Sequence, residues 1–231
     1  MARVPAIKTR SFLANLALFQ EMTPEELDRI AAGTTEVRLA KGQTLFQRGD
    51  PCVGFHVVIY GQVKLAFVSP HGSEKVVEVM GPGVSFGEAL MFTDRPYVVY
   101  AQALADALVL HISKATIDAE LDRDPRLARR MIAGMSRRLH GLIADVESYS
   151  LRSGMQRVIG YLLRDIDEHA TAPGPVQVRL DIGKGVIASR LNLTPEHFSR
   201  ILAELSHEGL IVVRGAEIEI LDPDRMRAFL A

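Results

Sequence analysis

The chain contains 231 residues, of which 27 are basic and 28 acidic, so its formal net charge is −1 at pH 7. Hydrophobic residues make up 48% of the sequence, which is enough for packed cores and excludes a largely disordered chain. The even charge balance excludes a uniformly basic surface, so any site for nucleic acid must be local.

The single cysteine, Cys52, limits the chemistry further. It excludes an internal disulfide, a four-cysteine zinc site and a cysteine-ligated iron–sulfur cluster, and it fits a reducing cytoplasmic location. The apolar stretch FLANLALF (residues 12–19), interrupted by Asn15, favours an amphipathic helix over a signal peptide. No apolar run approaches the length of a membrane span, so we expect a soluble protein without a membrane partner.

The first part of the chain is predicted to change from helices to short strands. Thr23 and Glu26 form a capping box that opens a helix through Ile30. From about Thr34 to Ile112, short apolar or alternating runs are separated by Gly and Pro turns. Many short strands at roughly ten-residue spacing predict a β-barrel or sandwich.

The longest helical segment is predicted to begin at Asp124-Pro125. Its apolar residues recur at alternating spacings of four and three, at Ala128, Ile132, Met135, Leu139, Leu142, Val146 and Tyr149. Such a narrow heptad stripe is typical of two helices that supercoil together. A core helix packed on its own barrel is the alternative. We favour a homodimer, with the interface formed by Ile132, Met135, Leu139, Leu142, Val146 and Tyr149.

The C-terminal third is predicted to be a winged helix-turn-helix. After a break near residues 149–154, a helix to about His169 and a loop at residues 171–175, the chain shows a strand (176–182), a short helix (184–191), a turn (192–193), a second helix and a hairpin (209–222). In this order the second helix enters the major groove of DNA. Gly183 and Gly185 predict a frayed start for the first helix of the pair.

The second helix, in LTPEHFSRILAEL (residues 193–205), carries the predicted DNA contacts. Thr194 is a good N-cap and Pro195 suits the first helical position. The apolar stripe comprises Phe198, Ile201, Leu202 and Leu205. On the opposite side, Arg200 can bind guanine, Glu196 can accept from cytosine, and Ser199 can donate or accept. A solvated helix face is the alternative. The predicted contacts are Thr194, Glu196, His197, Ser199 and Arg200, with Lys184, Arg190 and Arg214 for local phosphate contacts.

The whole chain resembles the family of the cyclic AMP receptor protein and the fumarate–nitrate reduction regulator. SFGEALMF (residues 85–92) is similar to the effector loop of the family, and EHFSR (196–200) to the Glu-x-x-Ser-Arg recognition pattern of the fumarate–nitrate branch. The resemblance implies an α+β fold: a cyclic-nucleotide-binding-type β-roll with N-terminal helices (1–124), a dimerisation helix (125–149) and a winged helix-turn-helix (150–231). It also implies TTGAT half-sites in an inverted repeat, roughly 34 Å apart, and contact with RNA polymerase.

The resemblance places the effector pocket at Gly87, Glu88, Ala89, Tyr97 and Val98. The cyclic AMP branch holds the cyclic phosphate with an Arg-Ser pair, and Tyr97 and Val98 stand at those positions. Arg95 is near, but it precedes Pro96 on an expected turn. A buried phosphate without a cation would cost several kcal/mol, so we expect no tight binding of cyclic AMP.

The stretches EALMFTDRPYVVYAQA, LRSGMQRVIGYLL and PEHFSR resemble most closely the dissimilatory nitrate respiration (Dnr-like) regulators. This resemblance implies nitric oxide sensing through a bound haem b and control of denitrification genes. No Cys-x-x-Cys-His pattern is present, so the haem would be held non-covalently. Of the seven histidines, His56 and His111 lie in predicted strands of the roll and are the ligand candidates. A cyclic nucleotide or another small ligand remains the alternative effector.

Two other classes of function, an enzyme and a ligand-binding roll without DNA function, are the alternatives to a DNA-binding regulator. An enzyme is not expected, because the sequence has no nucleophile elbow, P-loop, dinucleotide fingerprint or zinc motif. A ligand-binding roll without DNA function, as in cyclic-nucleotide-regulated kinases and channels, would not need the exposed PEHFSR helix. The winged C-terminal region therefore favours the regulator.

Overall fold

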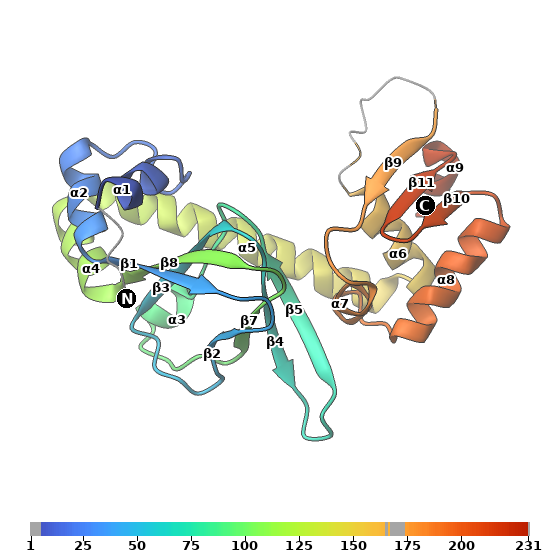
Figure 1. Cartoon of the computed structure of the whole chain (residues 1–231), viewed down its shortest axis with the longest axis horizontal. Helices are drawn as coiled ribbons and strands as arrows, with labels where there is room; N and C mark the ends of the chain where they lie inside the picture. The colour runs from blue at the N-terminus through green and yellow to red at the C-terminus, as the bar shows by residue number, and fades with distance from the viewer. Residues whose placement is uncertain (1–5, 165, 167–173, 231) are drawn as a thin grey trace. The chain divides into compact units, whose positions relative to one another are not determined.

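The structure, a computed structural model, describes residues 6–164, 166 and 174–230 (Figure 1). It divides into two compact units, Met1–His140 and Gly141–Ala231, and the division falls within the longest helix, α5 (Pro125–Leu151). The boundaries expected from the sequence, 124/125 and 149/150, lie close to the two ends of α5. None of the helices among the described residues combines the length and apolarity needed to cross a lipid bilayer.

The first unit begins with helices and continues as two antiparallel sheets. Within the described residues, the sheets have the strand orders β1-β8-β3-β6 and β2-β7-β4-β5. The elements are α1 (Ala6–Ala14), α2 (Pro24–Ala32), β1 (Thr34–Leu39), β2 (Thr44–Phe46), β3 (Gly54–Tyr60), β4 (Val63–Val68), β5 (Glu74–Met80), β6 (Ser85–Phe86), α3 (Glu88–Phe92), β7 (Tyr100–Ala103), β8 (Ala107–Ser113) and α4 (Lys114–Arg123). The predicted change from helix to strands at Thr34 is confirmed.

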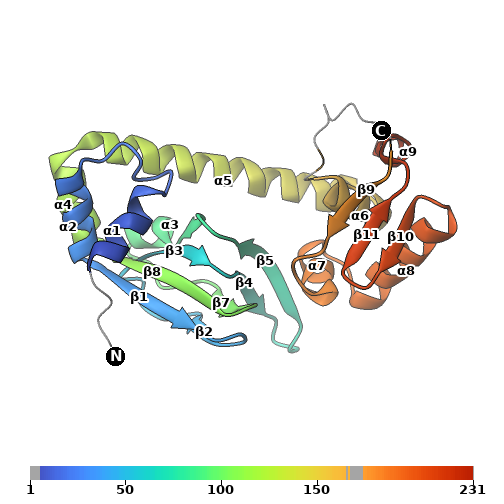
Figure 2. The same cartoon turned by 45° about the horizontal axis from the view of Figure 1, so that its top comes forward.

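Strand β3 is apolar along most of its length because both of its faces are covered. Side chains alternate between the faces of a strand. Phe55 and Val57 therefore enter the core that the helices share with one sheet, whereas Val58 enters the core between the two sheets. Figure 2 shows α1, α2 and α4 at one end of the sheet that contains β1, β8 and β3. It follows that His56, between Phe55 and Val57, faces the interior between the sheets.

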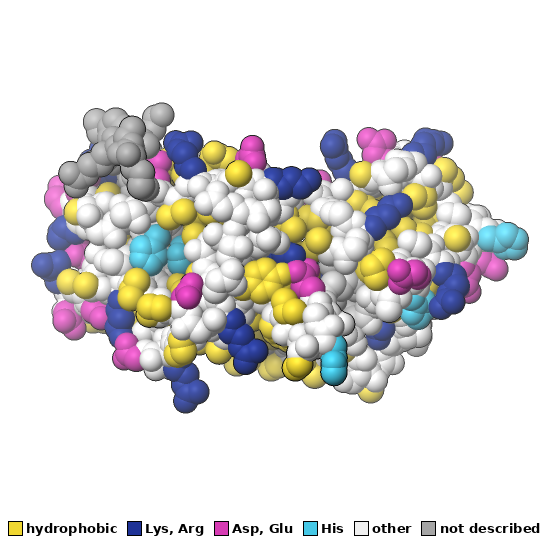
Figure 3. Space-filling model, turned by 60° about the horizontal axis from the view of Figure 1, so that its bottom comes forward, with side chains coloured by type: hydrophobic (Ala, Val, Ile, Leu, Met, Phe, Trp, Pro, Cys, Tyr) yellow, Lys and Arg dark blue, Asp and Glu magenta, His cyan; other side chains and the backbone are white. Residues whose placement is uncertain are grey.

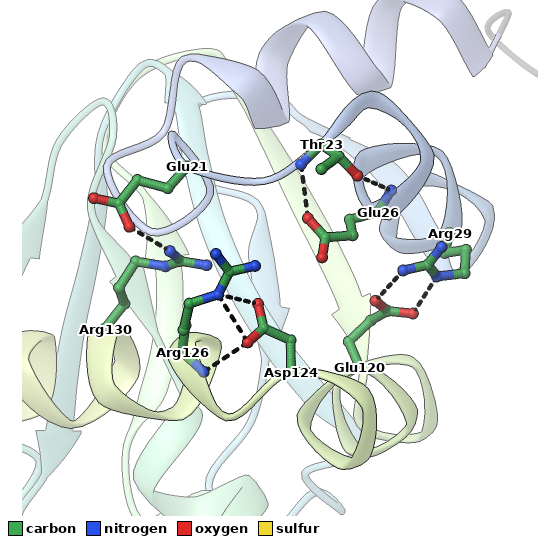
Figure 4. Close-up of polar contacts among 8 residues, drawn as sticks. All are labelled: Glu21, Thr23, Glu26, Arg29, Glu120, Asp124, Arg126 and Arg130. Atoms are coloured by element: carbon green, nitrogen blue, oxygen red, sulfur yellow. Dashed lines mark hydrogen bonds and ion pairs between the residues drawn. The ribbon is translucent and has the colours of Figure 1, made fainter.

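Ion pairs join the N-terminal segment to α4 and to the start of α5 (Figure 4). The side chain of Glu120 on α4 is only 2% exposed, and its carboxylate accepts from Arg29 of α2 at 2.6 and 2.9 Å and from Arg123 at 2.6 Å. Arg130 of α5 contacts Glu21 at 2.8 Å. The predicted capping box at the start of α2 is also confirmed. The Arg29–Glu120 pair holds α2 against α4, and the Arg130–Glu21 pair holds the connection before α2 against α5.

We expect Glu120→Gln to lower the free energy of unfolding by about 1.5–3 kcal/mol at pH 7, the usual worth of hydrogen bonds to charged groups. The hydrogen bond from Arg29 lowers the pKa of Glu120. Because the pKa of Glu120 is lower in the folded protein than in the unfolded chain, where it is about 4.3, the ionised carboxylate stabilises the fold. This stabilisation is fully present above pH about 4.3 and is lost as the pH falls through the pKa of the folded state. Urea unfolding from pH 7 to pH 3 should therefore show the two proteins converging in acid.

The exposed Glu25, in the first turn of α2, provides the control for this prediction. Glu25→Gln should cost less than about 1 kcal/mol, because this exposed charge interacts with the helix dipole and with Arg29 through water. A difference between wild type and Glu120→Gln that does not change with pH would contradict the charge-based explanation.

The second unit contains the predicted winged helix-turn-helix. Its elements after α5 are α6 (Gly154–Leu163), β9 (Val176–Arg179), α7 (Lys184–Arg190), α8 (Pro195–His207), β10 (Ile211–Arg214), β11 (Glu217–Ile220) and α9 (Pro223–Ala228). The strands form one antiparallel sheet in the order β10-β11-β9. The predicted order of helix, turn, helix and hairpin is confirmed. The expected helix end at His169 and residues 171–173 of the expected loop lie outside the described residues.

Helix α8 is held by one apolar face, as its sequence predicts. The side chains of Phe198, Ile201, Leu202 and Leu205 are at most 4% exposed and pack in one core with α6 and the sheet. Ala188 of α7 is fully buried, which lets α7 and α8 approach closely. Gly183 is the N-cap of α7 and provides no side-chain hydrogen bond. The opposite face of α8 is thereby left for other contacts.

Candidate functional site

Helix α8 begins where its sequence predicts. The Thr194 hydroxyl accepts a hydrogen bond from the amide of His197 at 3.2 Å, and Pro195 occupies the first helical position. The preceding turn contains Asn192 with a φ of 57°, a left-handed conformation that asparagine tolerates better than most residues. The start of α8 is therefore fixed by local hydrogen bonds before any ligand binds.

The outer face of α8 presents three polar side chains of complementary chemistry. Glu196, Ser199 and Arg200 are all exposed. The three groups lie within little more than one turn of the helix. The carboxylate can accept from cytosine, the guanidinium can bind guanine, and the hydroxyl can donate or accept. His197 differs from them, because a Cβ atom at Gly154 would lie 3.3 Å from its Cε1 atom. The structure therefore places His197 against the start of α6.

The predicted phosphate contacts lie on two elements. Lys184 and Arg190, at the two ends of α7, are half-buried, and Arg214 is exposed at the end of β10. Arg214 also forms an ion pair with Glu219 at 3.3 Å. On the face of the molecule in Figure 3, basic and acidic side chains alternate without a broad basic patch. On this face, phosphate contacts would have to come from individual cations.

One contact near α8 was missed by the sequence analysis. Arg157 of α6 donates from Nη2 to the carbonyl of Asn192 at 3.5 Å and from Nη1 to the carbonyl of Arg152 at 3.0 Å. The Ser153 and Gln156 capping box at the start of α6 is the pattern that could have pointed to this region. Arg157 thus supports the turn between α7 and α8.

The predicted effector loop lies in the first unit, at the start of α3. Gly87 has a φ of 102°, which favours glycine, and Glu88 beside it is buried. Burial raises the pKa of Glu88, opposed by a hydrogen bond with Ser85 and by the charge of Arg138. Arg138, on α5, donates to the carbonyl of Ser85 at 3.2 Å and pairs with Glu78 at 2.8 Å. The loop is therefore connected to α5 through one guanidinium.

Tyr97 and Val98, which precede β7, differ in exposure. Tyr97 is buried with its ring stacked on Phe46, at 3.5 Å between centroids, and burial raises the pKa of its hydroxyl. Val98 is 56% exposed, and Ala89 is also exposed. The five predicted pocket residues are therefore divided between the interior and the surface.

The haem-ligand candidates face each other across two paired strands. His56 of β3 is in register with His111 of β8, and His56 Nε2 lies 3.2 Å from His111 Nδ1. Burial, with the nearby His111, lowers the pKa of His56 to about 3, so the ring is neutral at physiological pH. Its Nδ1 atom has no hydrogen-bond partner among the described residues. The ring centroids of Phe46 and Phe86 lie 5.5 and 5.3 Å from the centroid of the His56 ring.

Helix α5 uses two different apolar faces. Leu127 and Met131, near its start, are buried in the core of the first unit, which the sequence analysis did not predict. The predicted stripe is instead exposed on the single chain, by 37–62% at Ile132, Leu139, Leu142 and Val146, with the unpredicted Ile143 at 56%. Met135 is half-buried. Tyr149 is also half-buried, and its hydroxyl donates to the carbonyl of Arg190.

Comparison with known proteins accounts for both units. Residues 36–124 match the family description "Cyclic nucleotide-binding domain", and residues 156–229 match "Crp-like helix-turn-helix domain". The crystal structure of DNR from Pseudomonas aeruginosa is 34% identical to this chain over 99% of this chain and all of that one, with a TM-score of 0.51. The chain belongs to the Crp/Fnr family.

Two curated relatives place the chain within this family of regulators. The transcriptional activator protein Anr of Pseudomonas aeruginosa is 29% identical over 91% of this chain and 86% of its own length. A CRP-like cAMP-activated global transcriptional regulator of Mycobacterium tuberculosis is 24% identical, over 93% and 96%. The Crp/Fnr chain is therefore a DNA-binding transcription regulator and not an enzyme. The predicted fold class and family are confirmed.

We expect this Crp/Fnr protein not to bind cyclic AMP with micromolar or tighter affinity. A cyclic phosphate beside Gly87 would meet the stacked Tyr97 ring in place of a cation, and Arg95 is exposed. An unpaired buried anion costs several kcal/mol. Isothermal titration calorimetry measures this directly, with the Mycobacterium tuberculosis relative, named as cAMP-activated, as positive control. Micromolar affinity would contradict the prediction.

Proposed function

We propose that this regulator acts in the cytoplasm as a homodimer that binds an inverted repeat of TTGAT half-sites. The supporting observation is the outward placement of Glu196, Ser199 and Arg200 on a helix whose other face is buried. These three residues form the Glu-x-x-Ser-Arg pattern of the fumarate–nitrate branch. A guanidinium that binds O6 and N7 of guanine accounts for the guanine of each half-site.

The exposed stripe on α5 supports the homodimer. Several large apolar side chains that remain in water on one helix mark an interaction surface. Their heptad spacing suits a second copy of the same helix, which would bury both stripes together. A two-fold dimer presents two copies of α8 to half-sites about one helical turn apart, so the palindrome follows from the symmetry.

We also propose that the effector is nitric oxide, bound through a non-covalent haem b in the roll. His56 has the donor chemistry that haem iron accepts: in the tautomer that donates from Nε2 to His111, its unpartnered Nδ1 carries a free lone pair. The rings of Phe46 and Phe86 would have to move apart to admit a macrocycle. Haem iron, when bound, supplies the site at which nitric oxide binds.

Transmission to DNA would begin at the link between the effector loop and α5. Arg138 joins Glu78 and Ser85 to the long helix, so a ligand that displaces the loop also shifts contacts of α5. A ligand changes the output only if it binds two conformations with different affinity. We propose that this switch controls denitrification genes through contact with RNA polymerase. A cyclic nucleotide or another small ligand remains the alternative effector.

We expect the purified protein to bind haem with a Soret band that shifts on addition of nitric oxide, and His56→Ala to lower haem affinity at least tenfold. The loss follows from removal of the neutral imidazole with the free Nδ1 atom. His71→Ala, in an exposed turn, is the control. Haem titration followed by absorbance separates these cases. An unchanged Soret spectrum in the His56 variant would remove His56 as the ligand.

A gel shift tests the proposed function as a whole. Wild-type protein should bind a TTGAT inverted repeat as two chains per duplex and bind a scrambled repeat of equal composition at least 10³-fold more weakly, the lower end for specific readers. Affinity should fall steeply with salt, because phosphate contacts release counterions. Equal affinity for both duplexes at physiological salt would overturn the proposal.

A further inference from the structure

The carbonyl groups at the end of helix α7 have identifiable partners. The last four carbonyls of any helix lack partners within it. Three of those of α7 are taken by amides of the following turn: Ile187 O by Leu191 N at 2.9 Å, Ala188 O by Leu193 N at 2.9 Å, and Ser189 O by Asn192 N at 3.1 Å. The fourth, the carbonyl of Arg190, accepts from the hydroxyl of Tyr149 at 2.5 Å. Amides of the turn thus bind three of the four carbonyls, and Tyr149 of α5 donates to the fourth.

This hydrogen bond joins the end of α5 to the end of α7, close to the short link between α5 and α6. Tyr149 lies two residues before the end of α5, and only Arg152 and Ser153 separate α5 from α6. Arg190 lies four residues before Thr194, the N-cap of α8. A rotation of the helix-turn-helix about the short link would therefore have to break the Tyr149 hydrogen bond.

The donor is well suited to a permanent contact. Burial, with the charge of Asp145, raises the pKa of Tyr149, so the hydroxyl keeps its proton throughout the physiological range. The side chain of Arg190 is not the acceptor, because the bond ends on its backbone carbonyl. The contact therefore depends on the Tyr149 hydroxyl and on the path of the backbone.

We propose that Tyr149 is a positioning residue: it fixes the direction of α8 relative to the end of α5 and thereby sets the half-site spacing that a dimer accepts. The proposal rests on the proposed binding to an inverted repeat. The heptad position of Tyr149 predicts a place in the dimer stripe. Its hydroxyl contacts the helix-turn-helix of its own chain.

Tyr149→Phe tests the proposal, because it removes the hydroxyl and keeps the ring. Binding is measured by fluorescence anisotropy on TTGAT repeats that differ only in the number of base pairs between half-sites, and on a single half-site. We expect the preference for the best spacer over spacers one base pair longer or shorter to fall about fivefold, the effect of one typical hydrogen bond. Affinity for the single half-site should not change.

Two controls separate positioning from other effects. A general loss of folded protein would weaken binding to every duplex equally and leave the spacer preference unchanged. Tyr60→Phe removes the hydroxyl of an exposed tyrosine in the first unit and shows how much the loss of any tyrosine hydroxyl affects binding. Arg190→Ala keeps the backbone acceptor, so we expect it to weaken binding at all spacers and to lower the salt slope by about 1.

The outcomes distinguish this inference from the function on which it rests. Wild-type protein that binds no TTGAT repeat would overturn the proposed function, and the inference with it. Wild-type protein with a clear spacer preference that Tyr149→Phe retains in full would overturn the inference alone.

Discussion

Replacing Arg200 with alanine should weaken binding to the TTGAT palindrome by about 1–3 kcal/mol per half-site, and so by roughly 30-fold to 10⁴-fold for both half-sites together. The guanidinium is the one group on the outer face of α8 that can bind both acceptors of guanine. Alanine is the best helix former and the helix is held by its buried stripe, so α8 should persist in the variant. The loss would then report on base contact.

The decisive measurement is discrimination at the guanine position. Wild-type protein should prefer TTGAT over a site with the guanine replaced, and Arg200→Ala should lose most of that preference while its non-specific binding changes little. Arg225→Ala, which removes an exposed arginine of α9 paired with Glu208, is the matched control and should resemble wild type. If Arg200→Ala bound TTGAT with the affinity and the guanine preference of the wild-type protein, Arg200 would be excluded from sequence recognition.

Local patterns predicted the elements that depend on local interactions. The start of α8 needs only a hydroxyl at Thr194, proline at the next position and an apolar residue at the right spacing, and each is visible in the sequence. The buried stripe of α8 follows from its helical period in the same way. The winged helix-turn-helix was therefore predictable in order and nearly in its boundaries.

Contacts between distant segments were not predictable in this way. His56 and His111 were each assigned to a strand, but their facing positions depend on the register of β3 against β8, which no local pattern contains. Heptad spacing likewise assigned Tyr149 to the stripe and could not reveal a hydrogen bond to a backbone carbonyl 41 residues away. Leu127 and Met131 were missed because their burial depends on the roll that packs against them.

Placing a charge in the α5 stripe should convert the dimer to monomers. We expect Leu139→Glu to be monomeric at micromolar concentration, because each buried leucine contributes about 1.5–3 kcal/mol and two-fold symmetry doubles the loss. Leu139 is 58% exposed on the single chain, so its replacement should leave the fold of each unit intact. Analytical ultracentrifugation measures the mass, and thermal unfolding reports on the fold.

Ala144→Glu is the matched control for this prediction. Ala144 is exposed in the same helix, but its heptad position lies opposite the stripe. The same charge there should leave the protein dimeric, since glutamate is nearly as good a helix former as alanine. A monomeric Ala144→Glu protein would mean that added charge anywhere on α5 disrupts association, and the stripe would lose its special role.

Loss of the dimer should also separate two contributions to DNA binding. Joining two reading units makes the second contact intramolecular, which is worth about 10²–10⁴-fold in affinity, so Leu139→Glu should bind the palindrome that much more weakly. Its affinity for a single half-site should remain near wild type, and so should its guanine preference, because the core that holds α8 contains no residue of the stripe. Arg200→Ala should show the reverse pattern: a dimer that has lost the guanine preference. A Leu139→Glu protein that is monomeric yet binds the palindrome as tightly as wild type would contradict recognition by a symmetric pair of helices.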